Sequence, residues 1–243
     1  MKTFVMGDIH GNNHGLLQCL QRADFNFEED TLIQLGDVAD GWSEVSECVD
    51  TLLSIKNLIA IRGNHDVWCY DWIMSGRSPM LWTQQGGVAT INSYRRTLRY
   101  IDKDHRDFWQ NQKDWHIDDQ NRLFIHAGWD YMAPGSFEDQ ASMPVNAGSI
   151  AKECHWDRFI IQGAMSAFGL NGTKNGKFKT LEQFKEVYIG HTVLKDGPTF
   201  LGNLTNMDTG SGYGFELSIM NIDTKEVFKS DQAKDLYPDE KGR

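Results

Sequence analysis

The sequence predicts an α/β fold built on parallel strands. Three short apolar runs in the first quarter of the chain each end in a glycine-centred turn, and two segments with helical spacing of apolar residues lie between them. A βαβαβ array of this kind has right-handed crossovers, so the turns after its strands gather at the sheet edge where ligands bind. The 243 residues are 40% hydrophobic and 12% aromatic, which is enough for one large core. We therefore predict a single domain over residues 1–243.

The first strand is expected at residues 3–6, and it runs directly into a turn. That turn reads Gly7-Asp8-Ile9-His10-Gly11. Asp8 and His10 stand at positions i and i+2, so their side chains can point at one spot. Taken alone, the same pattern also fits a solvated turn with an aspartate cap and a surface histidine. The next helix is predicted at residues 12–23, where apolar residues recur at the spacing of one helical stripe.

The next two strands repeat this plan. The second strand is expected at residues 31–35, the second helix at residues 43–55 and the third strand at residues 58–61. The turns after these strands read Gly36-Asp37 and Arg62-Gly63-Asn64-His65-Asp66. Each strand therefore ends in a glycine turn that carries polar side chains.

Two later strands of the same kind follow a helical, tryptophan-rich segment over residues 67–122. We expect most of these tryptophans to pack against the sheet and a few to line a substrate groove. The strands are expected at residues 123–125 and 187–189. They end in His126-Ala127-Gly128 and Gly190-His191-Thr192.

The segments around these later strands are predicted to be less regular. Pro134, Pro144 and the polar residues 171–176 favour loops between the two strands. Alternating residues over 215–228 predict a hairpin that turns at 223–225. We expect residues 230–243 to form a polar, disordered extension.

Composition excludes several classes of function. The formal net charge is −10, with 34 acidic against 24 basic residues, which argues against binding of nucleic acid through its phosphates. Small-molecule or protein substrates fit this charge better. The four cysteines are scattered and no signal peptide precedes the first strand, so we expect free thiols and a cytoplasmic location. No apolar stretch approaches the ~20 residues of a membrane helix, so we expect a soluble protein with no membrane partner.

Six side chains that offer oxygen or imidazole ligands stand just after strand-like runs. They are Asp8, His10, Asp37, Asn64, His126 and His191. Imidazole with carboxylate suits Mn, Fe, Zn or similar ions, and the absence of cysteine argues against a structural zinc site. Six ligands exceed the need of one ion, so we predict a pair of divalent ions about 3.5–4 Å apart, which suits hydrolysis at phosphorus. Asp37 is the expected bridge. The other four histidines have no such context and stay unassigned.

Together these motifs resemble the successive signatures of the calcineurin-like metallophosphoesterases. More narrowly, they resemble the bacterial and phage serine/threonine phosphoprotein phosphatases. Further similar stretches are Gln85-Gly86-Gly87, Trp156-Asp157-Arg158 and Asp208-Thr209-Gly210. The resemblance extends from Met1 to about Asp223. It implies two mixed β-sheets sandwiched between helical layers.

The resemblance also implies roles for single residues. Asp8, His10, Asp37 and His191 would bind one metal or bridge, and Asn64 and His126 would complete the second. Arg62 and Arg158 look like phosphate clamps, because guanidinium groups suit phosphate oxygens, and Asn64 would also contact the phosphate. His65 with Asp40 resembles the proton-donating pair of the family.

Two departures from the family pattern are visible. Asp40 is followed by Gly41 and Trp42, where Arg-Gly is usual, so one arginine that contacts the substrate is missing. Asp66 stands where glutamate is usual. An arginine at position 41 would be expected to tighten phosphate binding, provided that the turn does not require a positive φ there.

Three functions remain open from the sequence. The first is a metal-dependent phosphoesterase with two divalent ions and a metal-bridging hydroxide as nucleophile. Its expected substrate is a phosphoserine or phosphothreonine protein, and a small phosphate ester is the next choice. Manganese is the expected metal. The second is a symmetrical dinucleoside tetraphosphatase. The third is a non-catalytic metal-binding scaffold, against which the retained His65 and Asp40 argue.

Overall fold

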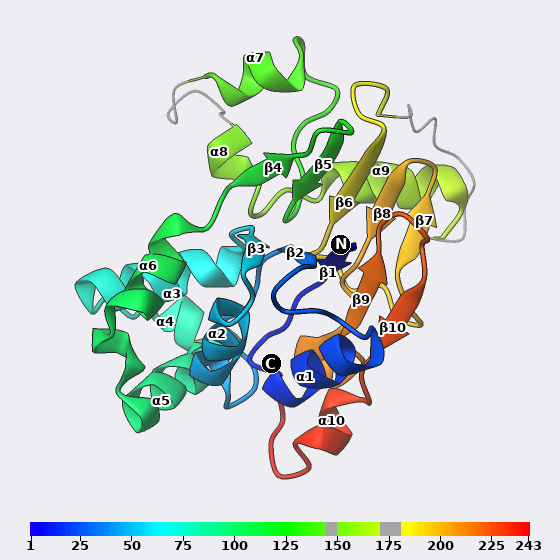
Figure 1. Cartoon of the computed structure of the whole chain (residues 1–243). Coiled ribbons are helices and arrows are strands. Elements are labelled where there is room, and N and C mark those ends of the chain that lie inside the picture. Colours follow the sequence, from blue (N-terminus) through cyan, green and yellow to red (C-terminus); the bar gives the residue numbers. More distant parts are fainter. Residues whose placement is uncertain (144–149, 171–180) are drawn as a thin grey trace.

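Two five-stranded mixed sheets lie at the centre of the protein in a computed structural model that describes residues 1–143, 150–170 and 181–243 (Figure 1). The first sheet has the order β10-β9-β1-β2-β3 and the second β4-β5-β6-β8-β7. The strands are β1 Thr3–Met6, β2 Thr31–Gln34, β3 Asn57–Ala60, β4 Trp115–Ile117, β5 Arg122–Ile125, β6 Glu186–Ile189, β7 Thr199–Leu201, β8 Leu204–Asn206, β9 Ser218–Asn221 and β10 Val227–Lys229.

The first sheet contains the predicted βαβαβ array. Strand β1 pairs in parallel with β2, with Thr3 opposite Thr31, and β2 pairs in parallel with β3. The crossovers are α1 Asn13–Arg22 and α2 Val45–Leu53. The predicted hairpin near residue 223 is also present, because β9 and β10 pair antiparallel and β9 lies against β1.

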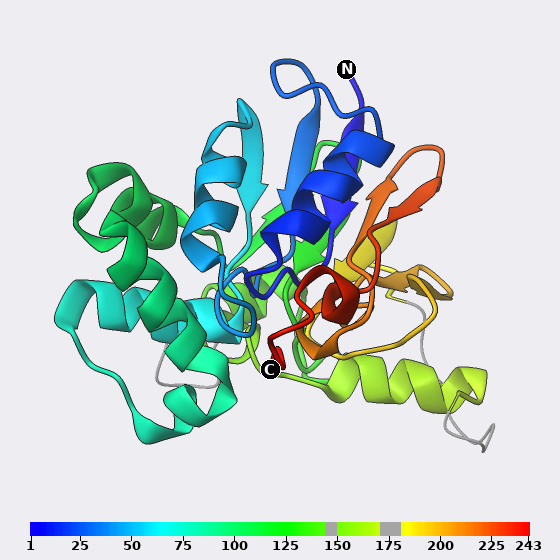
Figure 2. The ribbon, with the colours of Figure 1, turned by 90° about the horizontal axis from the view of Figure 1, so that it is seen from below.

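The side chains of β1 alternate between two cores, as the period of a strand requires. Phe4 and Met6 pack with the apolar faces of α1 and α2, whereas Val5 joins Phe124 and Tyr188 between the two sheets. Figure 2 shows α1 and α2 on one side of the sheets and α9 Phe159–Phe168 on the other. The expected sandwich of two mixed sheets between helical layers is therefore confirmed.

The second sheet differs in detail from the expectation. Strands β4, β7 and β8 are short and did not stand out in the sequence. The loops expected between β5 and β6 contain the helices α7 Phe137–Ala141, α8 Ile150–Glu153 and α9. Helix α9 forms because Ile160, Ile161 and Ala164 cover the second sheet, so the expectation of little regular structure was wrong there. Pro144 and residues 171–176 lie outside the described residues.

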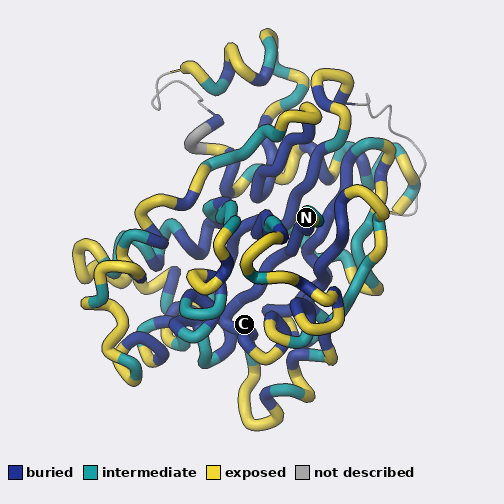
Figure 3. Tube along the Cα trace, viewed as in Figure 1, coloured by how far each residue is buried: buried dark blue, intermediate teal, exposed yellow. Residues whose placement is uncertain are grey.

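The tryptophan-rich segment is helical, as predicted. It contains α3 Asn64–Ser75, α4 Met80–Trp82, a kink with non-helical backbone angles at Gln85 and Gly86, α5 Val88–Thr97 and α6 Lys103–Asn111. Trp82 and Trp109 are fully buried here. Figure 3 shows buried residues concentrated in the sheets, with many exposed residues at the outer side of this helical segment.

The last residues of the sequence are ordered, contrary to the expected disordered extension. Helix α10 Ala233–Leu236 packs through Ala233 and Tyr237 on the buried Trp42. The sequence is polar here, but it supplies Ala233 and Tyr237, which cover Trp42 and leave it only 1% exposed. Among the described residues, no helix combines the length and the apolar character that crossing a membrane requires.

Candidate metal centre and active site

The turns after β1, β2, β3, β5 and β6 bring the six predicted ligands to one place. Parallel strands place these turns at the same end of their sheets. The ligand atoms of Asp8, His10 and Asp37 lie within 4.8 Å of one another, and so do those of Asp37, His126 and His191. The sixth predicted ligand is close as well, because Asn64 Oδ1 lies 3.2 Å from His126 Nε2.

Asp37 belongs to both groups and lies at their centre. Its Oδ2 atom is 3.7 Å from His10 Nε2 and 3.4 Å from His126 Nε2. His191 is grouped with Asp37 and His126, whereas its backbone N–H contacts Asp8, so the expected division of ligands between two metals stays a prediction for this residue. A carboxylate shared by two ligand groups is the geometry that a bridging ligand needs.

Backbone carbonyls orient the two histidines beside Asp37. The Nδ1 atom of His10 donates to Ala39 O at 3.0 Å, and that of His126 donates to Leu35 O at 2.7 Å. Each bond fixes the ring so that Nε2 faces Asp37. This arrangement is typical of histidines that bind metals through Nε2.

Several of these residues have an uncommon backbone conformation. Positive φ angles occur at His10 (53°), Asp37 (55°), Asp40 (73°) and His191 (66°). Such angles cost a non-glycine residue free energy and are concentrated at functional sites. The turns are thus held in conformations that aim these side chains inward.

The Oδ2 atom of Asp37 is the clearest sign that cations fit this centre. Asp37 is 1% exposed, and within the described residues this oxygen has no hydrogen-bond donor. A buried carboxylate oxygen without a donor is costly unless a cation binds it. Carboxylate, imidazole and amide oxygen are ligands that divalent transition ions accept.

The charges at the centre lead to the same conclusion. Burial and the neighbouring Asp208 carboxylate raise the pKa of Asp8 well above its usual range, and burial raises the pKa of Asp208 to about 6. Burial favours the neutral ring of His126, but the Asp37 carboxylate raises the pKa of this imidazole to about 10. The raised pKa values show that this buried centre favours protonation of its acids and of His126. Bound divalent cations would supply positive charge in place of these protons.

A buried histidine–aspartate pair lies beside the ligands. His65 Nδ1 is 2.5 Å from Asp40 Oδ2, and the backbone N–H of His65 donates to Asp37 Oδ1 at 3.0 Å. Trp82 Nε1 and Thr90 Oγ1 also donate to the Asp40 carboxylate, at 2.8 and 2.7 Å. The other ring nitrogen, His65 Nε2, has no hydrogen-bond partner in the described part of the chain. Asp40 therefore fixes the ring and leaves Nε2 available.

Comparison with known proteins agrees with this geometry. Residues 1–141, more than half of the chain, match the family model described as calcineurin-like phosphoesterase. The chain belongs to the calcineurin-like phosphoesterase family. It is accordingly a hydrolase of phosphoric esters, and the residues that could hold divalent metals are the ones described above.

Relatives of this phosphoesterase have different names. Serine/threonine-protein phosphatase 1 of Salmonella typhimurium is 34% identical, with 90% of this chain and 91% of the relative covered. A symmetrical bis(5'-nucleosyl)-tetraphosphatase of Haemophilus ducreyi is 22% identical, with 96% and 100% covered. A solved serine/threonine phosphatase from Saccharomyces cerevisiae has a TM-score of 0.63 at 14% identity, over 95% of this chain and 80% of that one. That structural likeness supports the fold.

Asp208 is a residue of this phosphoesterase that sequence reasoning did not assign to the site. It follows β8 and is 3% exposed, and its carboxylate influences the pKa of Asp8. Its signal was the Asp-Thr-Gly turn itself, because the strand before it, Leu204–Asn206, is short and largely polar. Trp82 and Thr90 were also missed, because a contact with Asp40 more than 40 residues away leaves no local pattern.

The structure does not bring Arg62 to the metal centre. Its guanidinium donates to the carbonyls of Trp109 and Gln110 at 3.0 Å and lies over the ring of Tyr70. These contacts direct the guanidinium elsewhere, and the role of Arg62 as a phosphate clamp stays a prediction. Arg158, in contrast, donates to Thr192 Oγ1 at 3.1 Å and lines a groove beside His191.

Gly41 occupies a position that other residues tolerate poorly. Its φ is 85°, and a Cβ atom there would lie 2.9 Å from the His10 carbonyl oxygen. The condition for a helpful arginine at this position is thus not met. The phosphoesterase must obtain any further guanidinium from elsewhere in the chain.

Asp66 organises the turns that carry the ligands. Its carboxylate accepts backbone N–H groups of Asp37, Val38, Ala39 and Gly63, at 2.9 to 3.0 Å. An amide at position 66 would turn an NH₂ group toward one or more of these donors. We expect Asp66→Asn to lower the free energy of unfolding by about 2–4 kcal/mol, measured by urea unfolding with and without chelator.

Asp71 on the same helix provides the control. It pairs with Arg77 at the surface, and both side chains are more than one-third exposed. Asp71→Asn should change the free energy of unfolding by less than about 1 kcal/mol. Equal stability of the two variants would show that Asp66 does not hold these turns.

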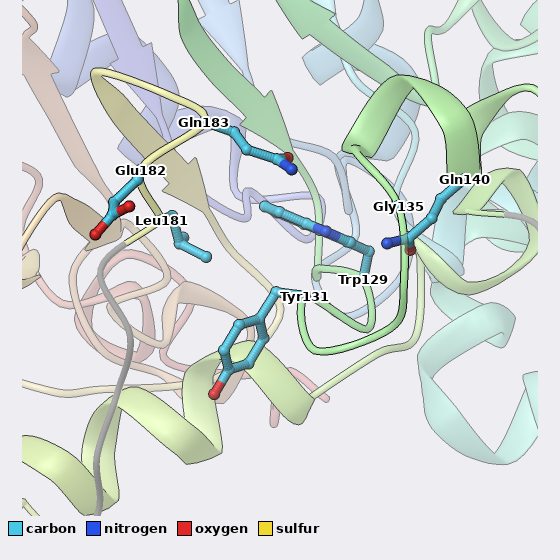
Figure 4. A pocket seen from close by; sticks show the side chains of 7 residues that line it. All are labelled: Trp129, Tyr131, Gly135, Gln140, Leu181, Glu182 and Gln183. Atoms are coloured by element: carbon cyan, nitrogen blue, oxygen red, sulfur yellow. The ribbon is translucent and has the colours of Figure 1, made fainter.

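One further pocket is separate from the candidate ligands. It has a volume of about 160 Å³ and is lined by Trp129, Tyr131, Gly135, Gln140, Leu181, Glu182 and Gln183 (Figure 4). None of the six candidate metal ligands borders it. We assign no part of the phosphoesterase reaction to this pocket.

Proposed function

We propose that this phosphoesterase is a metal-dependent phosphomonoesterase that acts on phosphoserine or phosphothreonine proteins. The observation that carries the proposal is the buried His65–Asp40 pair with a free Nε2 atom beside Asp37. An alkoxide of serine or threonine is a poor leaving group and requires a proton in the transition state. The 34% identity with a serine/threonine-protein phosphatase supports this substrate class.

Two divalent ions, when bound, would supply a water of lowered pKa as the nucleophile and would neutralise the phosphate. We propose Asp8, His10 and Asp37 for one ion, and Asp37, Asn64, His126 and His191 for the other, on the basis of the two ligand groups. Asp208 would be the acidic neighbour of Asp8 beside the first ion. Manganese is our proposed metal, because the ligand set contains oxygen and nitrogen only.

The protein's own residues have distinct tasks in this proposal. His65 donates a proton from Nε2 to the leaving oxygen, and Asp40 stabilises the imidazolium from the Nδ1 side. Arg158 borders the groove beside His191 and binds phosphate oxygens as a guanidinium fork. Trp68, whose ring lies 5.3 Å from that of His65, excludes water from this side of the acid.

A dinucleoside polyphosphate is the second candidate substrate, and the groove beside His191 favours it. This groove has a volume of about 540 Å³ and combines two cations, Arg158 and Lys195, with the rings of Tyr213 and Phe215. Cations suit a chain of phosphates, and aromatic rings suit stacking of a base. Relatives named as tetraphosphatases support this candidate at 22% and 25% identity.

The test is a substrate panel with metal-depleted and manganese-loaded protein. The panel contains a phosphoserine peptide, an aryl phosphate, a phosphodiester and a dinucleoside tetraphosphate. We expect no turnover after chelation and dialysis, recovery with Mn²⁺, and the highest kcat/KM on the phosphopeptide. Activity that survives excess chelator would exclude metal catalysis, and preference for the tetraphosphate would favour the second candidate.

We also propose that the protein acts in the cytoplasm. Its four cysteines are all buried and free, as expected for a chain that matures in a reducing compartment. The phosphorylated partner would then be a cytoplasmic protein.

A further inference from the structure

The last residues of the sequence dock on the loop that follows Asp40 and Gly41. The ring of Tyr237 stacks on that of Trp42, with centroids 5.2 Å apart. Ser43 donates from both its N–H and its hydroxyl to the Glu240 carboxylate. The Tyr237 hydroxyl donates to Glu44 Oε2 at 2.5 Å. Three consecutive loop residues therefore hold this segment, which we call the tail (residues 237–243).

The tail ends against the metal centre. Gly242 has a φ of 68°, and a Cβ atom there would lie 2.7 Å from the Trp42 ring, so only glycine fits. The N–H of Arg243 donates to Gly212 O at 2.8 Å. Gly212 itself lies so close to the His10 ring that a Cβ atom would be 2.5 Å from it. The backbone of the tail is thus fixed next to a candidate metal ligand.

The side chain of Arg243 points into the centre. Its Nη1 atom is 3.4 Å from His10 Nε2, and its Nη2 atom donates to Gln85 Oε1 at 3.4 Å. The guanidinium lies over Tyr213, which lines the same groove as Arg158. Within the described residues, no side-chain carboxylate lies within 4.0 Å of the Arg243 nitrogens. A guanidinium without an anionic partner therefore faces the nitrogen that would bind a metal.

We propose that Arg243 binds the phosphate of the substrate. A guanidinium and a metal ion that approach the same imidazole nitrogen would repel each other unless an anion lies close to both. A phosphate group is such an anion, and the planar fork of arginine matches its oxygens. The tail thus supplies the guanidinium that cannot stand at Gly41. This inference rests on the proposed phosphoesterase site.

Four variants test the proposal. Arg243→Ala removes the guanidinium, and Arg243→Lys keeps the charge without the fork. Gly242→Ala retains Arg243 but displaces it, since neither the φ nor the space permits a side chain. Lys241→Ala is the matched control, because it removes an exposed positive charge from the same tail.

Two quantities are measured on manganese-loaded protein. The first is KM and kcat for an aryl phosphate, and the second is the affinity for inorganic phosphate by calorimetry. We expect Arg243→Ala and Gly242→Ala to raise KM and to weaken phosphate binding by about 10–100-fold. Arg243→Lys should fall between these variants and the wild type, and Lys241→Ala should match the wild type.

The outcomes separate this inference from the proposed function. Unchanged KM and phosphate affinity in both Arg243→Ala and Gly242→Ala would overturn the role of Arg243. A lower KM or a faster rate in Arg243→Ala would mean that the tail blocks the site, which also overturns the proposal. If Arg243→Ala weakens phosphate binding but the wild type hydrolyses no substrate, Arg243 binds phosphate as proposed. The proposed enzymatic activity would then be refuted.

Discussion

Asp37→Asn is expected to abolish metal binding at both proposed positions and to lower kcat by at least about 10³-fold. Asp37 is the one ligand shared by the two groups of candidate ligands, and its unpartnered Oδ2 atom faces both His10 and His126. The change removes one negative charge. It also replaces one of the two carboxylate oxygens, Oδ2 or Oδ1, with an NH₂ group, which donates hydrogen bonds and cannot bind a metal. The amide has nearly the same shape, so the loss should not come from unfolding.

The measurement is metal content by elemental analysis after gel filtration, together with kcat on an aryl phosphate. Asp71→Asn is the control, because it removes a carboxylate that pairs with Arg77 at the surface and belongs to neither group of candidate ligands. That variant should keep the metal content and rate of the wild type. Near-normal metal content and rate in Asp37→Asn would rule out a bridging role.

His65→Asn is expected to keep its metals and to lose activity selectively. A phosphoserine peptide expels an alkoxide that needs a proton, whereas an aryl phosphate expels a phenolate that needs little assistance. General-acid catalysis typically contributes about 10²–10⁴-fold, so the loss on the peptide should exceed the loss on the aryl phosphate by a factor in this range. Asp40→Asn should show a milder form of the same pattern.

The rates are measured for both substrates at saturating concentration, with metal content determined on the same samples. His105→Asn is the matched control, since His105 is also buried but contacts Tyr94 and Asp50, outside the centre. It should leave the ratio of the two rates unchanged. Equal losses of rate on both substrates in His65→Asn would mean that His65 stabilises the nucleophile or the transferred phosphate and is not the general acid.

The part of the site that lies directly after strands could be predicted from the sequence. A strand end and the next two or three residues form one local unit, so the positions of Asp8, Asp37 and His126 follow from periodicity and from parallel pairing. Asp208 obeys the same rule, but β8 is only three residues long and its pattern is weak. Strands β1 and β2 are also predicted well, because they are buried on both faces and their sequences are therefore largely apolar runs.

The arginines could not be placed in this way. Arg62 is adjacent to a ligand turn, yet its long side chain reaches the carbonyls at the end of α6 instead. Arg243 is 233 residues away from His10 in sequence and approaches it only through the docking of the tail on Trp42. A long flexible side chain can follow several paths, and contacts between distant residues decide which one it takes.

The pairing of β1 with β9 also determines when this protein can become active during its synthesis. Residues at both ends of the chain are required, because the Asp8 carboxylate accepts the N–H of His191 and β1 borders Ser218–Asn221. A ribosome releases the first three strands long before it releases these partners. Contacts so distant in sequence form late in folding. A nascent chain that has not yet reached His191 therefore lacks part of the proposed ligand set, and β1 finds its partner β9 only after Asn221 has been made.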